Sequence, residues 1–236
     1  MKIIISASKT LKKQPIFYDT EVKGELLNKN ITSSLVNKIK LLDKEQMSKI
    51  MKINNKLLNN TYDLYKSYDN ADEYQAISLY DGTVFKQLHI DESSLSYINN
   101  HVTILSALYG VIEPFTPIKP YRLDMHMNIT DQSIYKIWSN DINNYFKNEI
   151  IINLASDEYS HMVNKEKINI IFYQLKDNRL KKISYHCKVA RGKMLNYIVS
   201  NKINDINILK QYNYDGYKYS SKLSEYNNLV FIKELA

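Results

Sequence analysis

The chain of 236 residues contains little cysteine, glycine or proline and no long apolar segment. Its single cysteine, Cys187, excludes an internal disulfide framework and favours a reducing compartment. No segment approaches the roughly 18 consecutive apolar residues of a membrane span. The apolar run that follows Met1 is too short for the core of a signal peptide. We therefore expect a cytoplasmic protein with no membrane partner.

The short motifs by which many enzymes are recognised are also absent. The sequence has no glycine-rich phosphate loop, no zinc-ligand spacing and no nucleophile elbow. Its five histidines show no metal-ligand spacing. We therefore expect neither a metal site nor a cofactor, with the adjacent His186 and Cys187 as a minor candidate. Any site must be assembled from polar clusters that follow buried strands.

The formal net charge of +7 is compatible with a polyanionic partner, which basic surfaces bind by releasing counterions. However, lysine, asparagine, isoleucine and tyrosine are all heavily used, and tyrosine alone occurs 20 times. A coding bias explains the excess of lysine equally well. Composition by itself does not decide between a nucleic-acid partner and a solvated basic surface.

Short apolar runs and helical patterns alternate along the chain without a linker. Strands are predicted over residues 2–6, 75–79, 150–154, 168–173, 180–186 and 229–232. Helices are predicted over residues 31–42, from a cap at Asp43 with Gln46 three residues later, and over 53–67, 91–107, 133–146 and 190–203. We expect residues 176–179 to join two of the strands as a hairpin. The pattern predicts a mixed α/β fold, a single domain over residues 1–236 with a central mixed sheet surrounded by helices.

The first polar cluster, Ser6-Ala7-Ser8-Lys9-Thr10, directly follows the predicted N-terminal strand. Hydroxyl groups and one ammonium in a tight turn suit a phosphate or a carboxylate. The alternative is an ordinary polar turn.

The second cluster, Ser156-Asp157-Glu158-Tyr159, follows the apolar run of residues 150–154. It can be a helix start, with Ser156 as the N-cap and two acids that complement the helix dipole. Alternatively, Asp157 and Glu158 are a candidate catalytic pair, if their surroundings separate their pKa values. The sequence suits both interpretations.

The third cluster contains Lys188, Arg191 and Lys193, between a predicted strand and a predicted helix. Cations at a helix N-terminus oppose the helix dipole by about 0.3–1 kcal/mol each. A negative group should offset them, either the carboxylates of the second cluster or a bound polyanion.

A fourth cluster combines Tyr109-Gly110 with Tyr121-Arg122 and Asp124. Two residues apart on an extended segment, Arg122 and Asp124 point to the same side. They either complete a site or form an exposed pair.

Seven motifs in order resemble the YaaA peroxide-stress protein family, and they cover essentially the whole chain to about Phe231. They lie at residues 6–10, 105–111, 120–123, 135–141 around Trp138, 152–159, 190–192 and 215–217. The resemblance implies a cytoplasmic bacterial protein that limits iron-dependent oxidative damage during peroxide stress. It also implies a single-domain fold largely particular to the family.

The resemblance further implies sequence-independent binding of duplex or junction DNA through phosphate contacts. A helix–hairpin–helix-like element would place its hairpin at residues 108–111, entered by the helix over 91–107. Lys9, Arg122, Lys188 and Arg191 would line a basic cleft. Ser6, Thr10, Tyr109, Gly110, Tyr121 and Lys193 complete the expected anion-binding set.

An alternative is an enzyme of unknown reaction that acts on an anionic small molecule or a nucleotide. Phosphate clamping needs no acid pair, and acids in a DNA cleft would be repelled. Asp157 or Glu158 would then be the general base, while Lys9 and Arg191 hold an anionic group. Direct iron sequestration has poor ligand support. The sequence leaves open whether any reaction is catalysed.

Overall fold

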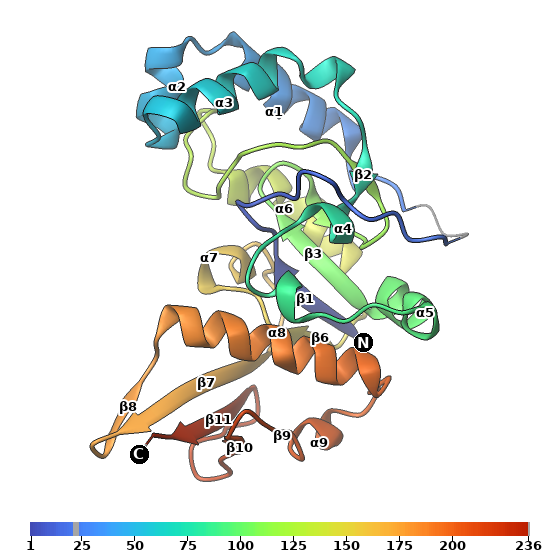
Figure 1. Ribbon diagram of the computed structural model, residues 1–236, viewed down its shortest axis with the longest axis vertical. Coiled ribbons are helices and arrows are strands. Elements are labelled where there is room, and N and C mark those ends of the chain that lie inside the picture. The colour runs from blue at the N-terminus through green and yellow to red at the C-terminus, as the bar shows by residue number, and fades with distance from the viewer. Residues whose placement is uncertain (21–23, 236) are drawn as a thin grey trace.

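The computed structural model describes residues 1–20 and 24–235 and confirms a single mixed α/β domain (Figure 1). The strands are β1 (Lys2–Ser6), β2 (Tyr74–Gln75), β3 (Val102–Ser106), β4 (Gly110–Ile112), β5 (Pro117–Ile118), β6 (Ile151–Asn153), β7 (Ile168–Lys176), β8 (Arg179–Lys181), β9 (Asn213–Tyr214), β10 (Tyr217–Tyr219) and β11 (Asn228–Glu234). The helices are α1 (Lys29–Leu41), α2 (Lys44–Met51), α3 (Asn55–Lys66), α4 (Ala76–Leu79), α5 (Glu92–His101), α6 (Ile134–Tyr145), α7 (Asp157–Ser160), α8 (Ser184–Ser200) and α9 (Ile206–Leu209), with 3-10 turns η1 (Tyr68–Asn70) and η2 (Phe85–Gln87). In the described residues none of these helices has the length and hydrophobicity of a membrane span.

A nine-stranded mixed sheet runs through the molecule in the order β4-β3-β1-β6-β7-β11-β10-β9, with β8 paired to β7. Strand β1 lies inside the sheet, paired on one side with β3 and on the other with β6. Its residues Ile3, Ile4 and Ile5 are therefore fully buried. The five neighbouring strands β3, β1, β6, β7 and β11 pair in parallel, which explains their continuous apolar runs.

After β1 the chain first returns to the sheet as β3 on one side, and later as β6 on the other side of β1. The C-terminal ends of β1 and β6 therefore meet at a topological switch point. Open α/β sheets bind ligands in the crevice outside such a point.

Helix α8 lies across one face of the sheet (Figure 1). Its inward side is apolar and includes Ala190, Met194 and Ile198. Gly192 lets the helix approach the segment before η2, since a Cβ atom there would lie 2.7 Å from the carbonyl oxygen of Val84. This close approach brings the basic residues of α8 to the switch point.

Several predicted elements are confirmed. The strands over 2–6, 150–154, 168–173 and 229–232 correspond to β1, β6, β7 and β11, and the hairpin over 176–179 joins β7 to β8. The cap of α2 is a capping box: Asp43 accepts a hydrogen bond from the Gln46 N–H at 2.8 Å, and the Gln46 side chain accepts one from the Asp43 N–H at 3.0 Å.

Two predicted elements change type within their length. The strand predicted over 75–79 is wrong beyond Gln75, because Ala76–Leu79 forms the short helix α4. The helix predicted over 91–107 ends at His101, and the remainder is the buried strand β3. The β-branched residues of Val102–Ile104 suit a strand buried on both faces, and such a strand has no polar alternation to reveal it.

The boundary near residue 184 is also shifted. The strand predicted over 180–186 stops at Lys181, and α8 begins at Ser184, six residues before the predicted start at 190. Cys187, Ala190 and Met194 are buried at helical spacing, so packing against the sheet extends the helix toward its N-terminus.

The helix–hairpin–helix expectation is not confirmed at residues 108–111. Strands rather than helices lie on both sides, and β3 and β4 pair as an antiparallel hairpin in which Ser106 faces Gly110. Gly110 has φ 71°, and its Cα lies against the ring of Trp138, which leaves no space for a side chain. The backbone of this turn is buried rather than presented to a ligand.

Candidate anion-binding cleft at the switch point

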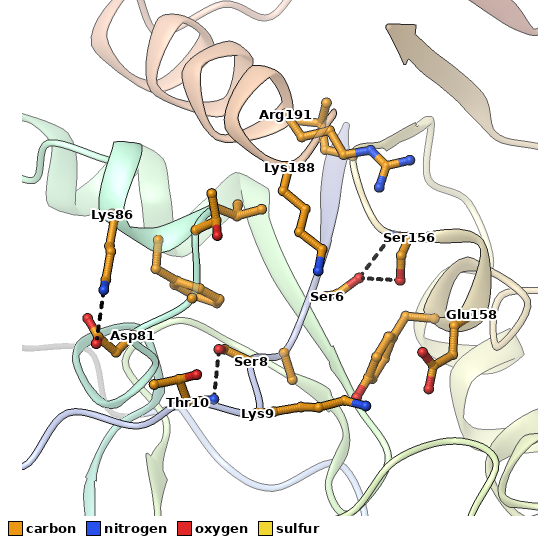
Figure 2. Close-up of a pocket in the computed structure, with 17 residues that line it drawn as sticks. Ser6, Ser8, Lys9, Thr10, Asp81, Lys86, Ser156, Glu158, Lys188 and Arg191 are labelled. Atoms are coloured by element: carbon orange, nitrogen blue, oxygen red, sulfur yellow. Dashed lines mark hydrogen bonds and ion pairs between the residues drawn. The ribbon is translucent and has the colours of Figure 1, made fainter. Parts of the chain in front are cut away.

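A cleft of about 480 Å³ opens outside the C-terminal ends of β1 and β6 (Figure 2). Four segments form its walls: the turn after β1, the loop at 81–86, the turn between β6 and α7, and one side of α8. The lining residues are Ser6, Ala7, Ser8, Lys9, Thr10, Asp81, Gly82, Thr83, Val84, Phe85, Lys86, Leu154, Ser156, Glu158, Tyr159, Lys188 and Arg191. Residues of all three polar clusters, at 6–10, 156–159 and 188–193, thus converge, although Asp157 and Lys193 are not in the lining.

The hydroxyl of Ser6 joins the two strand ends at the floor of the cleft. Ser6 Oγ accepts a hydrogen bond from the Ser156 N–H at 2.9 Å and lies 3.1 Å from Ser156 Oγ. Ser8 packs against the loop at 81–86, because a Cβ atom on Gly82 would lie 2.6 Å from Ser8 Oγ. The glycine therefore allows the opposite wall to approach the turn after β1.

Two of the basic side chains have acidic partners. Lys9 Nζ lies 2.7 Å from Asp124 Oδ2, and Lys86 Nζ lies 3.3 Å from Asp81 Oδ2. Lys9, Lys86 and Asp81 line the cleft, whereas Asp124 lies outside its lining. The positive charges of the two lysines are therefore largely balanced by the protein itself.

Lys188 and Arg191 differ from these pairs. Within the described part of the chain, neither side chain makes a hydrogen bond or an ion pair. Figure 2 shows the Lys188 ammonium directed into the cleft toward Ser6, whereas the Arg191 guanidinium extends past Ser156. Burial lowers the pKa of Arg191 below its ordinary value. Lys188 is exposed and, among the described residues, unpaired, whereas the partly buried Arg191 has the charge of Asp157 nearby. The net positive charge of this wall of the cleft favours an anion.

The two acids of the second cluster separate. Glu158 lies in the cleft, and its Oε1 is buried without a hydrogen-bond partner. The side chain of Asp157 is 75% exposed outside this cleft, where its Oδ2 lies 3.5 Å from Lys182 Nζ. Ser156 precedes α7 as expected for an N-cap, although its side chain makes no capping hydrogen bond. The candidate acid–base pair is thus reduced to Glu158.

The third cluster is not at a helix N-terminus. Lys188, Arg191 and Lys193 lie in the second and third turns of α8, so the predicted conflict with the helix dipole does not arise. Lys193 does not line the cleft, because its Nζ pairs with Asp215 Oδ2 at 3.0 Å.

The fourth cluster lies outside the lining of the cleft, and Tyr121, Arg122 and Asp124 border a small void next to it. Tyr121 is buried, and its hydroxyl lies 2.8 Å from that of Tyr80 and 2.7 Å from Ser106 Oγ. Burial raises the pKa of Tyr121 to about 12, so the phenol stays protonated. The Tyr109 hydroxyl lies 2.7 Å from that of Tyr68 in the same way. Gly110 also lies outside the cleft lining.

Arg122 lies beside the cleft rather than in it. It borders a small void with Lys9, Asp124 and Tyr159, and its Nε is buried without a hydrogen-bond partner.

The sequence did not predict that the loop at 81–86 forms a wall of the cleft, because only the Asp81-Gly82 pair signals a turn there. Among residues 1–20 and 24–235, no three His, Cys, Asp or Glu side chains gather where they could hold a metal ion.

The chain matches the model of a family described as peroxide stress protein YaaA over residues 1–223. A UPF0246 protein of Fusobacterium nucleatum is 39% identical to it over 249 residues, which covers 99% of both chains. UPF0246 proteins of Rickettsia felis and Rickettsia bellii are 34% and 36% identical, and each comparison covers 99% of this chain and 100% of the relative. The chain therefore belongs to the YaaA family of peroxide stress proteins.

Proposed function

We propose that this cytoplasmic stress protein binds an anionic small molecule or nucleotide in the switch-point cleft. The observation that carries the proposal is the unpaired ammonium of Lys188, which points toward the hydroxyl of Ser6 (Figure 2). A cavity of about 480 Å³ is in the range of small-molecule sites. Its position outside two parallel strand ends is the usual one for ligands of α/β sheets.

The lining suits a ligand with two different ends. The hydroxyls of Ser6 and Ser156 and the ammonium of Lys188 would hold a phosphate or carboxylate group. The carboxylate of Glu158, which lines the cleft, would accept a hydrogen bond from an N–H or O–H group of the same ligand. A nucleotide has both kinds of group. If a reaction occurs here, Glu158 is the candidate general base.

Isothermal titration calorimetry against a panel of nucleotides tests this proposal. Lys188→Glu should lower the affinity of the best ligand tenfold or more, and it should reduce the slope of log affinity against log salt. Lys222→Glu is the matched control, because it changes the net charge equally at an exposed site outside the cleft. Absence of binding across the panel, or equal losses in both variants, would contradict a nucleotide site here.

A second candidate function is sequence-independent DNA binding, which the β7–β8 hairpin favours. Lys176, Arg179, Lys181 and Lys182 are exposed on or next to β8, which lies at the edge of the molecule in Figure 1. They surround the exposed Leu180, and clustered basic side chains of this kind are the electrostatic footprint of a nucleic-acid contact. On either function, an effect on iron-dependent damage would be indirect.

Fluorescence anisotropy with linear duplex and four-way junction DNA over a salt series tests the second candidate. We expect the affinity for DNA to fall steeply with salt. If Arg179→Glu reduces this dependence and Lys222→Glu does not, the hairpin is supported as the DNA contact. Binding that Lys188→Glu weakens more than Arg179→Glu would instead place DNA at the cleft. If the anisotropy of the DNA does not rise on addition of the wild type or of any variant, DNA is contradicted as a partner.

A further inference from the structure

A second cavity of about 320 Å³ lies on the other side of the turn between β6 and α7. It shares only one lining residue, Arg191, with the switch-point cleft. Lys167, Lys182 and His161 also line it, together with Asp157 at its exposed rim. Figure 2 shows the Arg191 guanidinium extending past Ser156, away from the Lys188 ammonium.

The charges of this second cavity are not balanced. Asp157 is the one acidic residue among its lining residues, and its exposed carboxylate makes a long contact of 3.5 Å with Lys182. Lys167 Nζ donates to the carbonyl oxygens of Val163 at 2.7 Å and Lys165 at 3.3 Å, which carry no formal charge. Arg191 has no hydrogen bond or ion pair within the described residues. The partly buried Arg191 and Lys167 therefore face the cavity, with Lys182 as a third cation and Asp157 as the one acidic neighbour in the lining. This excess of positive charge favours a bound anion.

A ladder of side-chain amides keeps the wall of the cavity in place. Asn153 Nδ2 donates to Asn169 Oδ1 at 2.8 Å, and Asn169 Nδ2 donates to Asn228 Oδ1 at 3.0 Å, so the ladder crosses β6, β7 and β11. Asn153 Oδ1 also accepts a hydrogen bond from the Ala155 N–H at 2.9 Å. The turn that divides the two cavities is thus held in position before any ligand arrives, which lowers the entropic cost of binding.

We propose that this cavity is a second anion site, separate from the cleft, that takes a phosphate-like oxyanion. Arg191 contributes a planar guanidinium that can donate two parallel hydrogen bonds to such a group, while Lys182 and Lys167 contribute point charges. Asp157 opposes the anion from the rim. The proposal does not depend on the ligand of the cleft, because only Arg191 is common to both.

Titration with inorganic phosphate, followed through backbone amide NMR shifts, tests this site. Amides of Lys167 and Asn169 should shift saturably in the wild type and in Lys188→Glu. Lys182→Glu should weaken the apparent affinity tenfold or more, whereas Lys181→Glu, the exposed neighbour outside the lining, should leave it within twofold. Asp157→Asn should tighten it severalfold, because it removes the opposing carboxylate.

Each contrary outcome has a distinct meaning. Shifts that do not saturate, or that Lys181→Glu weakens as much as Lys182→Glu, would overturn the second site. Loss of the same shifts in Lys188→Glu would assign them to the cleft and also overturn it. Failure of the cleft would appear separately, as unshifted amides of Ser8 and Thr10 in a titration with nucleotides.

Discussion

The hydroxyl of Ser6 accepts a hydrogen bond from the backbone N–H of Ser156 at 2.9 Å, although 150 residues separate them in the chain. This contact closes the gap between the ends of β1 and β6, and it sets the distance between the hydroxyls at the floor of the cleft. The two serines are therefore not equivalent. Ser6 satisfies a backbone donor, whereas the Ser156 hydroxyl, within residues 1–20 and 24–235, makes its one hydrogen bond with Ser6.

Replacement of these serines should separate structural from binding effects. Ser6→Ala leaves the partly buried N–H of Ser156 without its acceptor, so we expect a loss of about 1–3 kcal/mol in unfolding free energy. Ser156→Ala keeps its own N–H bond to Ser6 and should cost less. Urea denaturation of both variants measures the difference. Equal losses would show that the backbone bond contributes little.

Gly192→Ala tests the close approach of α8 to the wall of the cleft. Alanine favours a helix over glycine by about 1 kcal/mol. The added methyl would lie 2.7 Å from the Val84 carbonyl oxygen, and such overpacking costs about 1–3 kcal/mol. We expect the overpacking to dominate and thermal unfolding to show a lower midpoint. A control at Ser184→Ala, on the exposed start of α8, should change stability little. A raised midpoint for Gly192→Ala would contradict the tight contact.

Cys187 should resist thiol reagents and peroxide in the folded protein. Its side chain is buried and its Sγ lies 3.5 Å from the Phe172 carbonyl oxygen. Burial raises the pKa of the thiol, more than the nearby Arg191 and Lys182 lower it. The thiolate is the reactive form. Reaction with Ellman's reagent should therefore be much slower in buffer than in urea, and rapid reaction in buffer would mean that Cys187 is a reactive site.

Asp215 should make stability depend on acid pH. Its hydrogen bond with Lys193 and the charge of Lys233 hold the pKa of Asp215 below its ordinary value. Because the folded pKa is lower than the unfolded one, the unfolded chain takes up the proton first. The stabilisation is thus present at neutral pH and is lost as the pH falls through about 4 and below. Thermal midpoints of the wild type and Asp215→Asn should differ at pH 7 and converge at low pH. Added salt of about 1 M should narrow the difference at pH 7.

Some parts of this structure follow directly from the sequence. The buried strands β1, β6, β7 and β11 have β-branched apolar runs with polar residues after them or turn signals beside them. Parallel strands end at one edge of a sheet, so clusters that follow β1 and β6 are expected along the same edge. The sequence left open whether these turns meet, because it does not display the pairing of β1 with β6 that brings Ser6 to Ser156.

Other parts depend on packing that the sequence does not display. The boundary between α5 and β3 follows the polar run Asn99-Asn100-His101, and neither glycine nor proline marks the end of the helix there, so the helical interpretation could be continued into β3. The neighbours Asp157 and Glu158 are about 100° apart around the short helix α7, and only the tertiary fold decides which enters the cleft. The six-residue shift at the start of α8 changed the environment expected for Lys188.

The central position of β1 has a consequence for how the protein is made. Ribosomes add roughly 5–20 residues per second, so about 7–30 s pass between synthesis of β1 and synthesis of its neighbour β6. During that interval Ile3, Ile4 and Ile5 have an unpaired apolar edge, which is prone to aggregation and suited to a chaperone. The cationic wall of the cleft emerges later still, with α8. Anion binding would therefore distinguish a chain translated past α8 from every shorter nascent chain.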